Sequence, residues 1–246
     1  MRGKDLRGNS SSRARYGDVR MNYLCHARDC LDRPFELLGA ILPDWLRILD
    51  RRARLRPWMV EGRAAAPGSP RAEIHSGLRR HFEDDRWFHA TPAFGEVTGE
   101  IARRIRTIHP DRPERRLRAS FYAHILLEML LDSWLMEERP DISREFAGAI
   151  AALDPQTVAD EAGRIAPHPV SGLESMIERF TDPRVLHGYQ DDAEVVRRLD
   201  RMGGHVSQPE LPPGFIEITS QARVLVRRHG AALLSRPGVS SVEGET

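Results

Sequence analysis

The amino-acid sequence predicts an all-α protein, and three observations support this class. Apolar residues recur at spacings of three and four along most of the chain, alternating runs typical of strands are nearly absent, and proline, glycine and Asx pairs separate the periodic stretches. The chain has 246 residues, of which 40% are hydrophobic and 30% are charged. These proportions are ordinary for a globular protein and leave enough apolar surface for a large core. We therefore expect a helical bundle in a single domain.

The elements follow from local signals. Residues 1–20 are polar and rich in arginine, so we expect a disordered basic extension before a domain at 21–234 and a disordered tail at 235–246. Helical periodicity runs through 33–54, where Pro43 is predicted to divide the stretch into two helices, and a loop is expected over 57–73. Further helices are expected at 73–90, 91–108, 114–136, 141–153, 155–165, 170–180, 183–202 and 213–234.

The ends of these helices carry recognisable residues. Thr91-Pro92, Asp154-Pro155 and Asp182-Pro183 each place a capping side chain before a proline that suits a first helical turn. Gly203-Gly204 is a typical helix end. The helix expected at 114–136 is the most apolar in the chain, so we place it at the centre of the bundle together with the helix at 73–90.

Composition excludes several classes of function. The net charge of +1 is that of neither a polyanion binder nor an acidic protein, and aromatic residues do not interleave with the arginines, so we expect no nucleic-acid partner.

No apolar run approaches the ~20 residues of a membrane span, and no apolar secretion signal is present, so we expect a cytoplasmic protein. Cys25 and Cys30 lack a second pair and are expected to be free thiols. Gly-rich phosphate loops and the serine elbow of esterases are absent.

Two stretches each place three potential metal ligands four residues apart. One contains His81, Asp85 and His89, and the other contains His124, Glu128 and Asp132. Residues at i, i+4 and i+8 share one helix face with a drift of roughly 80°. The second trio lies among apolar residues, and buried carboxylates are costly unless they are paired or bind a metal. The alternative is a solvated polar stripe or a satisfied core histidine.

Two further residues fit a metal site. His26 lies in the apolar stretch Tyr23 to Ala27, and Asp44 interrupts the apolar run from Leu38 to Leu49. Each is more often a core or capping residue when it stands alone, but beside two ligand helices they suggest convergence. Mixed nitrogen and oxygen ligands favour Mn, Fe or Zn over calcium. Two metals bridged by a carboxylate would account for so many ligands, would lower the pKa of a water and would clamp a phosphoryl oxygen.

Arginines cluster in three segments, at 47–56, 103–106 and 115–118. They are either solvated helix faces or a basic rim that attracts an anionic substrate. For the second interpretation, the residues expected to receive the substrate are Arg51, Arg52, Arg79 and Arg80.

Three segments resemble a known family. They are MNYLCHA at 21–27 with LGAILPDW at 38–45, GLRRHFEDDRWFHATP at 77–92, and YAHILLEMLLDSW at 122–134. Their spacing and order, at low identity over 21–136, resemble the acyl carrier protein phosphodiesterase family. His81 falls on the histidine of that family's second motif and Asp85 on its first aspartate. His89, His124 and Glu128 stand where the family has acidic residues, and Ala40 replaces an asparagine.

The resemblance implies an HD-like helical fold and a divergent member of the metal-dependent phosphohydrolases. It implies hydrolysis of the phosphodiester that joins 4′-phosphopantetheine to a serine of holo acyl carrier protein, with manganese as the usual metal. Each substituted residue can still bind a metal. Residues after 140 match the family poorly, and the 57–73 loop resembles an insertion.

We therefore predict a metal-dependent phosphodiesterase that uses a divalent transition metal, manganese first and iron or zinc as alternatives. The predicted ligands are His26, Asp44, His81, Asp85, His124 and Glu128, with His89 and Asp132 as second choices. Asp85 is the predicted bridging or water-orienting carboxylate, and Glu128 is a predicted ligand or general base. Two alternatives stay open: a phosphoesterase for a nucleotide or phospholipid head group, and a non-catalytic helical binding protein.

Overall fold

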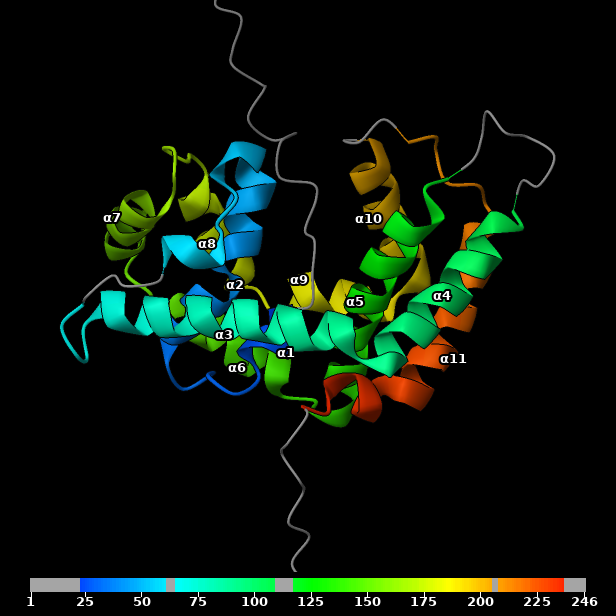
Figure 1. The fold of residues 1–246 in the computed structure, drawn as a ribbon, viewed down its shortest axis with the longest axis horizontal. Coiled ribbons are helices and arrows are strands. Elements are labelled where there is room, and N and C mark those ends of the chain that lie inside the picture. Colours follow the sequence, from blue (N-terminus) through cyan, green and yellow to red (C-terminus); the bar gives the residue numbers. More distant parts are fainter. Residues whose placement is uncertain (1–22, 61–64, 109–116, 205–207, 237–246) are drawn as a thin grey trace, which may run out of the picture.

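The computed structural model describes residues 23–60, 65–108, 117–204 and 208–236, and all regular structure in these ranges is helical (Figure 1). The predicted all-α class is therefore confirmed. The expected extension at 1–20 and all but the first two residues of the tail at 235–246 lie outside the described ranges. The α-helices are α1 (Tyr23–Ala27), α2 (Pro34–Leu49), α3 (Pro70–Ala90), α4 (Pro92–Arg106), α5 (Ala119–Glu138), α6 (Ile142–Ala151), α7 (Pro155–Ile165), α8 (Leu173–Phe180), α9 (Arg184–His187), α10 (Asp192–Gly204) and α11 (Phe215–Leu234). Short 3-10 turns are η1 (Arg51–Ala53), η2 (Pro57–Met59) and η4 (Gly188–Gln190).

Helix starts follow the capping signals of the sequence. The side chains of Thr91 and Asp154 accept hydrogen bonds from backbone N–H groups three residues later, each directly before a proline. Ser69 does the same for α3, which therefore begins at Pro70, three residues before the predicted start. These caps satisfy backbone donors that a helix leaves without an internal partner.

Two predictions about where helices divide are wrong. Pro43 does not divide the helix over 33–54, because α2 continues through it from Pro34 to Leu49. Every residue from Glu36 to Leu46 is buried, so packing on all sides of α2 outweighs the backbone hydrogen bond that proline cannot donate. The single helix predicted at 183–202 is instead α9, η4 and α10, because Asp191 accepts from the backbone N–H of Glu194 and caps a new helix.

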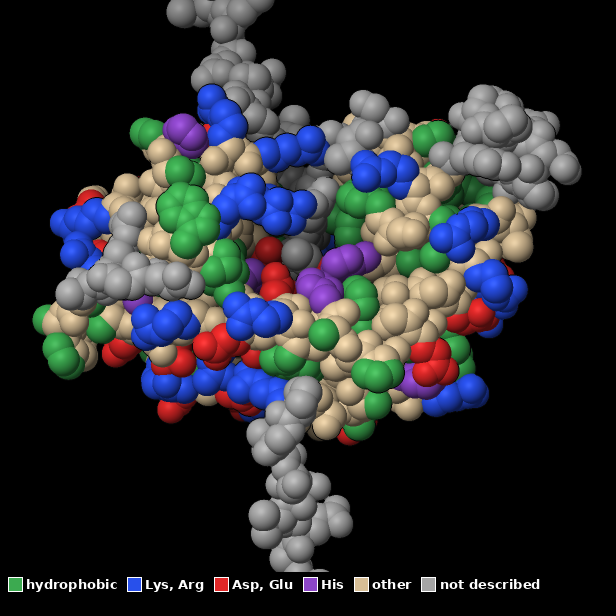
Figure 2. All heavy atoms as spheres, in the orientation of Figure 1, with side chains coloured by type: hydrophobic (Ala, Val, Ile, Leu, Met, Phe, Trp, Pro, Cys, Tyr) green, Lys and Arg blue, Asp and Glu red, His purple; other side chains and the backbone are tan. Residues whose placement is uncertain are grey.

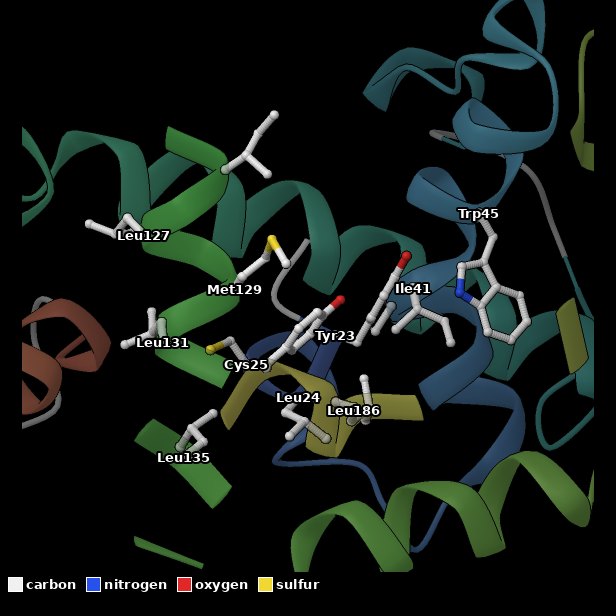
Figure 3. Packing of buried hydrophobic residues seen from close by; sticks show 14 of the residues in the cluster. Tyr23, Leu24, Cys25, Ile41, Trp45, Leu127, Met129, Leu131, Leu135 and Leu186 are labelled. Atoms are coloured by element: carbon white, nitrogen blue, oxygen red, sulfur yellow. The ribbon is translucent and has the colours of Figure 1, made fainter. Parts of the chain in front are cut away.

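The helices form two groups around the short helix α1. Helix α3 runs alongside α2, while α5 packs against α4, α10 and α11 (Figure 1). All five residues of α1 are buried, and this helix contacts α2, α3, α5 and α6. Core residues labelled in Figure 3 come from α1 (Tyr23, Leu24, Cys25), α2 (Ile41, Trp45), α5 (Leu127, Met129, Leu131, Leu135) and α9 (Leu186). The three helices that carry most of the predicted ligands therefore meet α1 at the centre of the protein.

Two glycines let α2 and α3 approach closely. A Cβ atom at Gly77 would lie 1.9 Å from the carbonyl oxygen of Glu36, and one at Gly39 would lie 2.1 Å from that of Ile74. These neighbours are backbone atoms, which cannot rotate away as a side chain could. The contact lies one turn before Ala40 and His81, so it sets the distance between α2 and α3 at the residues of interest.

We expect Gly77→Ala to lower the free energy of unfolding by about 3 kcal/mol, because the added methyl group forces the two helix backbones apart. Gly99 is the matched control: it is an exposed position within α4, and a Cβ there meets nothing within 4 Å. Gly99→Ala is expected to raise stability by up to ~1 kcal/mol through helix propensity. Urea unfolding of both variants measures the difference, and equal effects at the two positions would contradict the close approach.

No helix in the described ranges combines the length and the apolar character that a membrane span requires.

Candidate metal centre

The first candidate site brings together His26 of α1, Asp44 of α2 and His81 of α3. One potential ligand atom from each lies within 4.8 Å of the other two. All three side chains are buried, with relative exposures of 4%, 4% and 3%. The residues come from positions separated by up to 55 places in the sequence (26 to 81), so only the packing of α1, α2 and α3 unites them.

His81 is held in one orientation and one tautomer. Its Nδ1 donates a hydrogen bond of 2.8 Å to the carbonyl oxygen of Ala40, so Nε2 carries the free lone pair. Burial, together with the charge of His26, lowers the pKa of His81 to about 4, which keeps the ring neutral at pH 7. A hydrogen bond from the outer ring nitrogen to a backbone carbonyl is the usual arrangement of a metal-binding histidine.

His26 faces carboxylates on both sides of its ring. Its Nδ1 lies 3.6 Å from Asp84 and its Nε2 lies 3.7 Å from Asp85, while the ring packs 4.4 Å from that of His81. Burial alone would lower the pKa of His26, but the interactions with Asp84, Asp85 and Asp44 outweigh it and raise the pKa to about 9. Without a metal, this imidazole therefore carries a positive charge at neutral pH, at the point where a cation would replace the proton.

Asp44 is a buried carboxylate with an unsatisfied oxygen. Its Oδ2 has no hydrogen-bond partner among the described residues. Burial raises the pKa of Asp44 well above its usual range, and the charges of Asp85 and Glu128 add to this effect. A buried carboxylate in this position is costly unless a cation neutralises it.

The second candidate site lies between the C-terminal end of α3 and the middle of α5. Nε2 of His89 lies 3.2 Å from Nε2 of His124, which lies 2.7 Å from Oε1 of Glu128. Burial would raise the pKa of Glu128, but hydrogen bonds from the two histidines lower it to about 2. Burial likewise would lower the pKa of His124, and Glu128 raises it instead. The carboxylate is therefore ionised beneath two imidazoles.

Asp85 lies between the two sites. Its Oδ2 is 3.6 Å from Nε2 of His81, and its Oδ1 faces His26. Its charge also raises the pKa of His124 in the second site. The side chain is 35% exposed, so this carboxylate reaches solvent whereas Asp44 does not.

Asp132, a second-choice ligand, lies in neither group. Its Oδ1 accepts a hydrogen bond of 3.1 Å from the backbone N–H of Cys25, in the helix that carries His26. Burial raises the pKa of Asp132 to about 8, although the backbone N–H groups of Leu24 and Cys25 oppose the rise. Its position indicates that it anchors α1 to α5.

Two functional candidates are absent from the predicted site residues, although Arg47 lies in the predicted arginine cluster at 47–56. Asp84 lies 3.6 Å from Nδ1 of His26 and is itself held by Arg236 at 2.6 Å and by the indole N–H of Trp87 at 3.1 Å, so its carboxylate is fixed beside His26. Arg47 lowers the pKa of both Asp44 and His124 by its charge and forms no ion pair with another described residue. The sequence signal for Arg47 is its position three residues after Asp44, which places both side chains on one face of a helix.

The arginines predicted to receive substrate have mixed surroundings. Arg80 forms ion pairs with Asp29 at 3.1 Å and Glu36 at 3.5 Å, and Arg52 pairs with Asp50 at 2.7 Å. Arg51 and Arg79 are exposed. Figure 2 shows histidine and acidic side chains at the bottom of a hollow, with basic side chains on its margins.

Comparison with known proteins gives no relative. No protein-family model, no curated protein and no solved structure matches this chain. The resemblance to the acyl carrier protein phosphodiesterase family, and the HD-like fold that it implies, therefore stay predictions.

Proposed function

We propose that this protein is a metal-dependent hydrolase of phosphodiesters. The observation that carries the proposal is the convergence of His26, Asp44 and His81 in the core, next to the partly exposed carboxylate of Asp85. Two imidazoles and a carboxylate, buried and close together, form a ligand set for a divalent transition metal.

The residues present fit such a metal in three respects. His81 offers Nε2 because its Nδ1 is bound to a backbone carbonyl. Nδ1 of His26 lies 3.6 Å from the carboxylate of Asp84. Asp44 has an oxygen without a hydrogen-bond partner among the described residues. Mixed nitrogen and oxygen ligands suit manganese, iron or zinc, whereas calcium prefers oxygen alone.

The chain's own residues have distinct roles in the proposed reaction. A divalent cation at this site would supply Lewis acidity and a nucleophilic water at neutral pH. Asp85 reaches solvent from within ion-pair distance of His26 and His81, so it orients the attacking water and accepts its proton. Arg47 receives the anionic phosphoryl oxygens, since its charge acts at both groups and is not engaged by a described carboxylate.

Glu128 is not the general base in this scheme, because its side chain is only 2% exposed and lies beneath His124 and His89. This position leaves it no direct path to a water outside the site. The general base is therefore Asp85 alone.

The substrate that the sequence resemblance favours is holo acyl carrier protein, from which 4′-phosphopantetheine would be released. Nucleotides and phospholipid head groups present the same phosphodiester and are the alternative substrates. All three substrates carry an ionised diester, which Arg47, engaged by no described carboxylate, would bind beside a metal.

A substrate panel tests the proposal. The purified full chain, reconstituted with Mn²⁺, Fe²⁺ or Zn²⁺, is assayed with holo acyl carrier protein, bis-p-nitrophenyl phosphate, cyclic and linear dinucleotides and glycerophosphodiesters. We expect metal-dependent hydrolysis of at least one diester, abolished by chelator and restored by metal. The absence of hydrolysis from every substrate with every metal would overturn the proposal in favour of a non-catalytic binding protein.

A further inference from the structure

We infer that His89, His124 and Glu128 form a second cation site, separate from the first and open to solvent. Its ligand would be a divalent transition cation that binds imidazole, of the chemical class of Zn²⁺. This inference goes beyond the proposed reaction, because it depends only on coordination geometry and would hold whatever the protein hydrolyses.

The distances between the three ligand atoms match those of ligands around one ion. The edges of the triangle are 3.2 Å between the two Nε2 atoms, 2.7 Å from His124 to Glu128 and 3.7 Å from His89 to Glu128. Ligands at about 2.1 Å from a metal lie ~3.4 Å apart in a tetrahedron and ~3.0 Å apart in an octahedron. The observed edges surround these values.

Glu128 provides a second, independent observation. Its residue is only 1% exposed, and its Oε2 has no hydrogen-bond partner among the described residues although Oε1 is bonded. A buried carboxylate normally satisfies both oxygens, because an unsatisfied acceptor keeps its full desolvation cost. A cation that Glu128 binds through one or both oxygens would remove that cost.

The protein holds the two imidazoles in place before any ion arrives. His124 and Glu128 are one turn apart on α5, so they share a face. The ring of Phe94, in the first turn of α4, packs edge-on against His89 at 4.8 Å and His124 at 5.3 Å. The single residue Thr91 joins α3 to α4, which fixes Phe94 beside His89. Preorganised ligands of this kind lose little entropy on binding.

The second site differs from the first in exposure. The side chains of His89 and His124 are 34% and 38% exposed, whereas His26, Asp44 and His81 are buried. A cation at the second site would therefore keep positions open to water and exchange more readily than one in the core. Two imidazoles also select against Mg²⁺ and Ca²⁺, which prefer oxygen ligands.

Metal titration of the apoprotein tests this inference without any assay of activity. Zn²⁺ binding is measured by equilibrium dialysis and calorimetry on the full chain and on four variants: His124→Gln, Glu128→Gln, His81→Gln for the first site and, as a matched control, His229→Gln. His229 is a half-buried histidine on α11, outside both groups. We expect two Zn²⁺ per chain for the wild type and the control, and a loss of more than about 100-fold in affinity for one of them in each of the other variants. Circular dichroism verifies that each variant is folded.

Three results would overturn the inference. In the first, the wild type binds one Zn²⁺ that His124→Gln and Glu128→Gln both retain. In the second, the wild type binds a single Zn²⁺ that His124→Gln and His81→Gln both lose, which would mean that the two groups share one ion. Equal competition by Mg²⁺ would contradict the imidazole ligands. These results decide whether a separate second site exists, whereas failure of the substrate panel with two bound Zn²⁺ would reject the proposed function alone.

Discussion

Asp85→Ala is expected to lower metal-dependent phosphodiester hydrolysis by about 10³-fold, the effect of removing a group that both orients and deprotonates the attacking water. The carboxylate faces His26 at 3.7 Å and His81 at 3.6 Å, and it reaches solvent. Because it is only partly buried, its removal leaves no large cavity, and the fold should persist. The measurement is kcat at saturating metal, with thermal unfolding as the check on folding.

Glu83 supplies the matched control for Asp85. It is an exposed acid two residues away on α3, and no described ion pair includes it. Glu83→Gln is expected to leave kcat within about twofold of the wild type, as for surface substitutions in general. Unchanged hydrolysis of every substrate by Asp85→Ala would contradict the assigned role.

Arg47→Ala is expected to lower kcat/KM for anionic diesters by about 10²-fold, because one charged contact to the transition state is lost in a partly desolvated site. Arg47 lies close enough to Asp44 and His124 to lower the pKa of both, and no described carboxylate pairs with it. Arg47→Lys should recover part of the loss, since lysine keeps the charge without the planar fork.

Arg52 is the comparison for Arg47, because the sequence predicts Arg52 as a substrate-binding residue and the structure favours Arg47. Sequence clustering places Arg52 among the substrate-binding residues, but its side chain is 79% exposed and is paired with Asp50. We expect Arg52→Ala to change kcat/KM by less than about threefold. A larger loss for Arg52→Ala than for Arg47→Ala would reverse the assignment.

Local sequence signals predicted the helices because capping is a local property. Thr91, Asp154 and the prolines that follow them act within one turn, so the starts of α4 and α7 were predictable. The continuity of α2 through Pro43 was not, because it depends on burial by elements distant in the sequence. The break before α10 was marked by Asp191, a capping residue that the helical periodicity obscured.

The grouping of the ligands follows from helix geometry that was available in the sequence. Residues eight apart share a face but lie ~12 Å apart along the axis, too far to bind one ion. His89 is therefore separated from His81, and Asp132 from His124, with Asp132 bonded to α1 instead. Which residues of α3 meet which of α5 depends on tertiary packing, as do the contacts of Asp84 with His26 and Arg236.

Metal analysis tests most directly whether a cation binds among His26, Asp44 and His81. The full chain is purified without chelator, dialysed and analysed. His81→Gln, Asp44→Asn and the control His229→Gln are treated in the same way. We expect the wild type and His229→Gln to retain one equivalent more of tightly bound transition metal than His81→Gln and Asp44→Asn, which stay folded and keep at most the more exchangeable ion of the second site. A wild-type protein that holds no manganese, iron or zinc after dialysis, even when each metal has first been supplied in excess, would contradict the account.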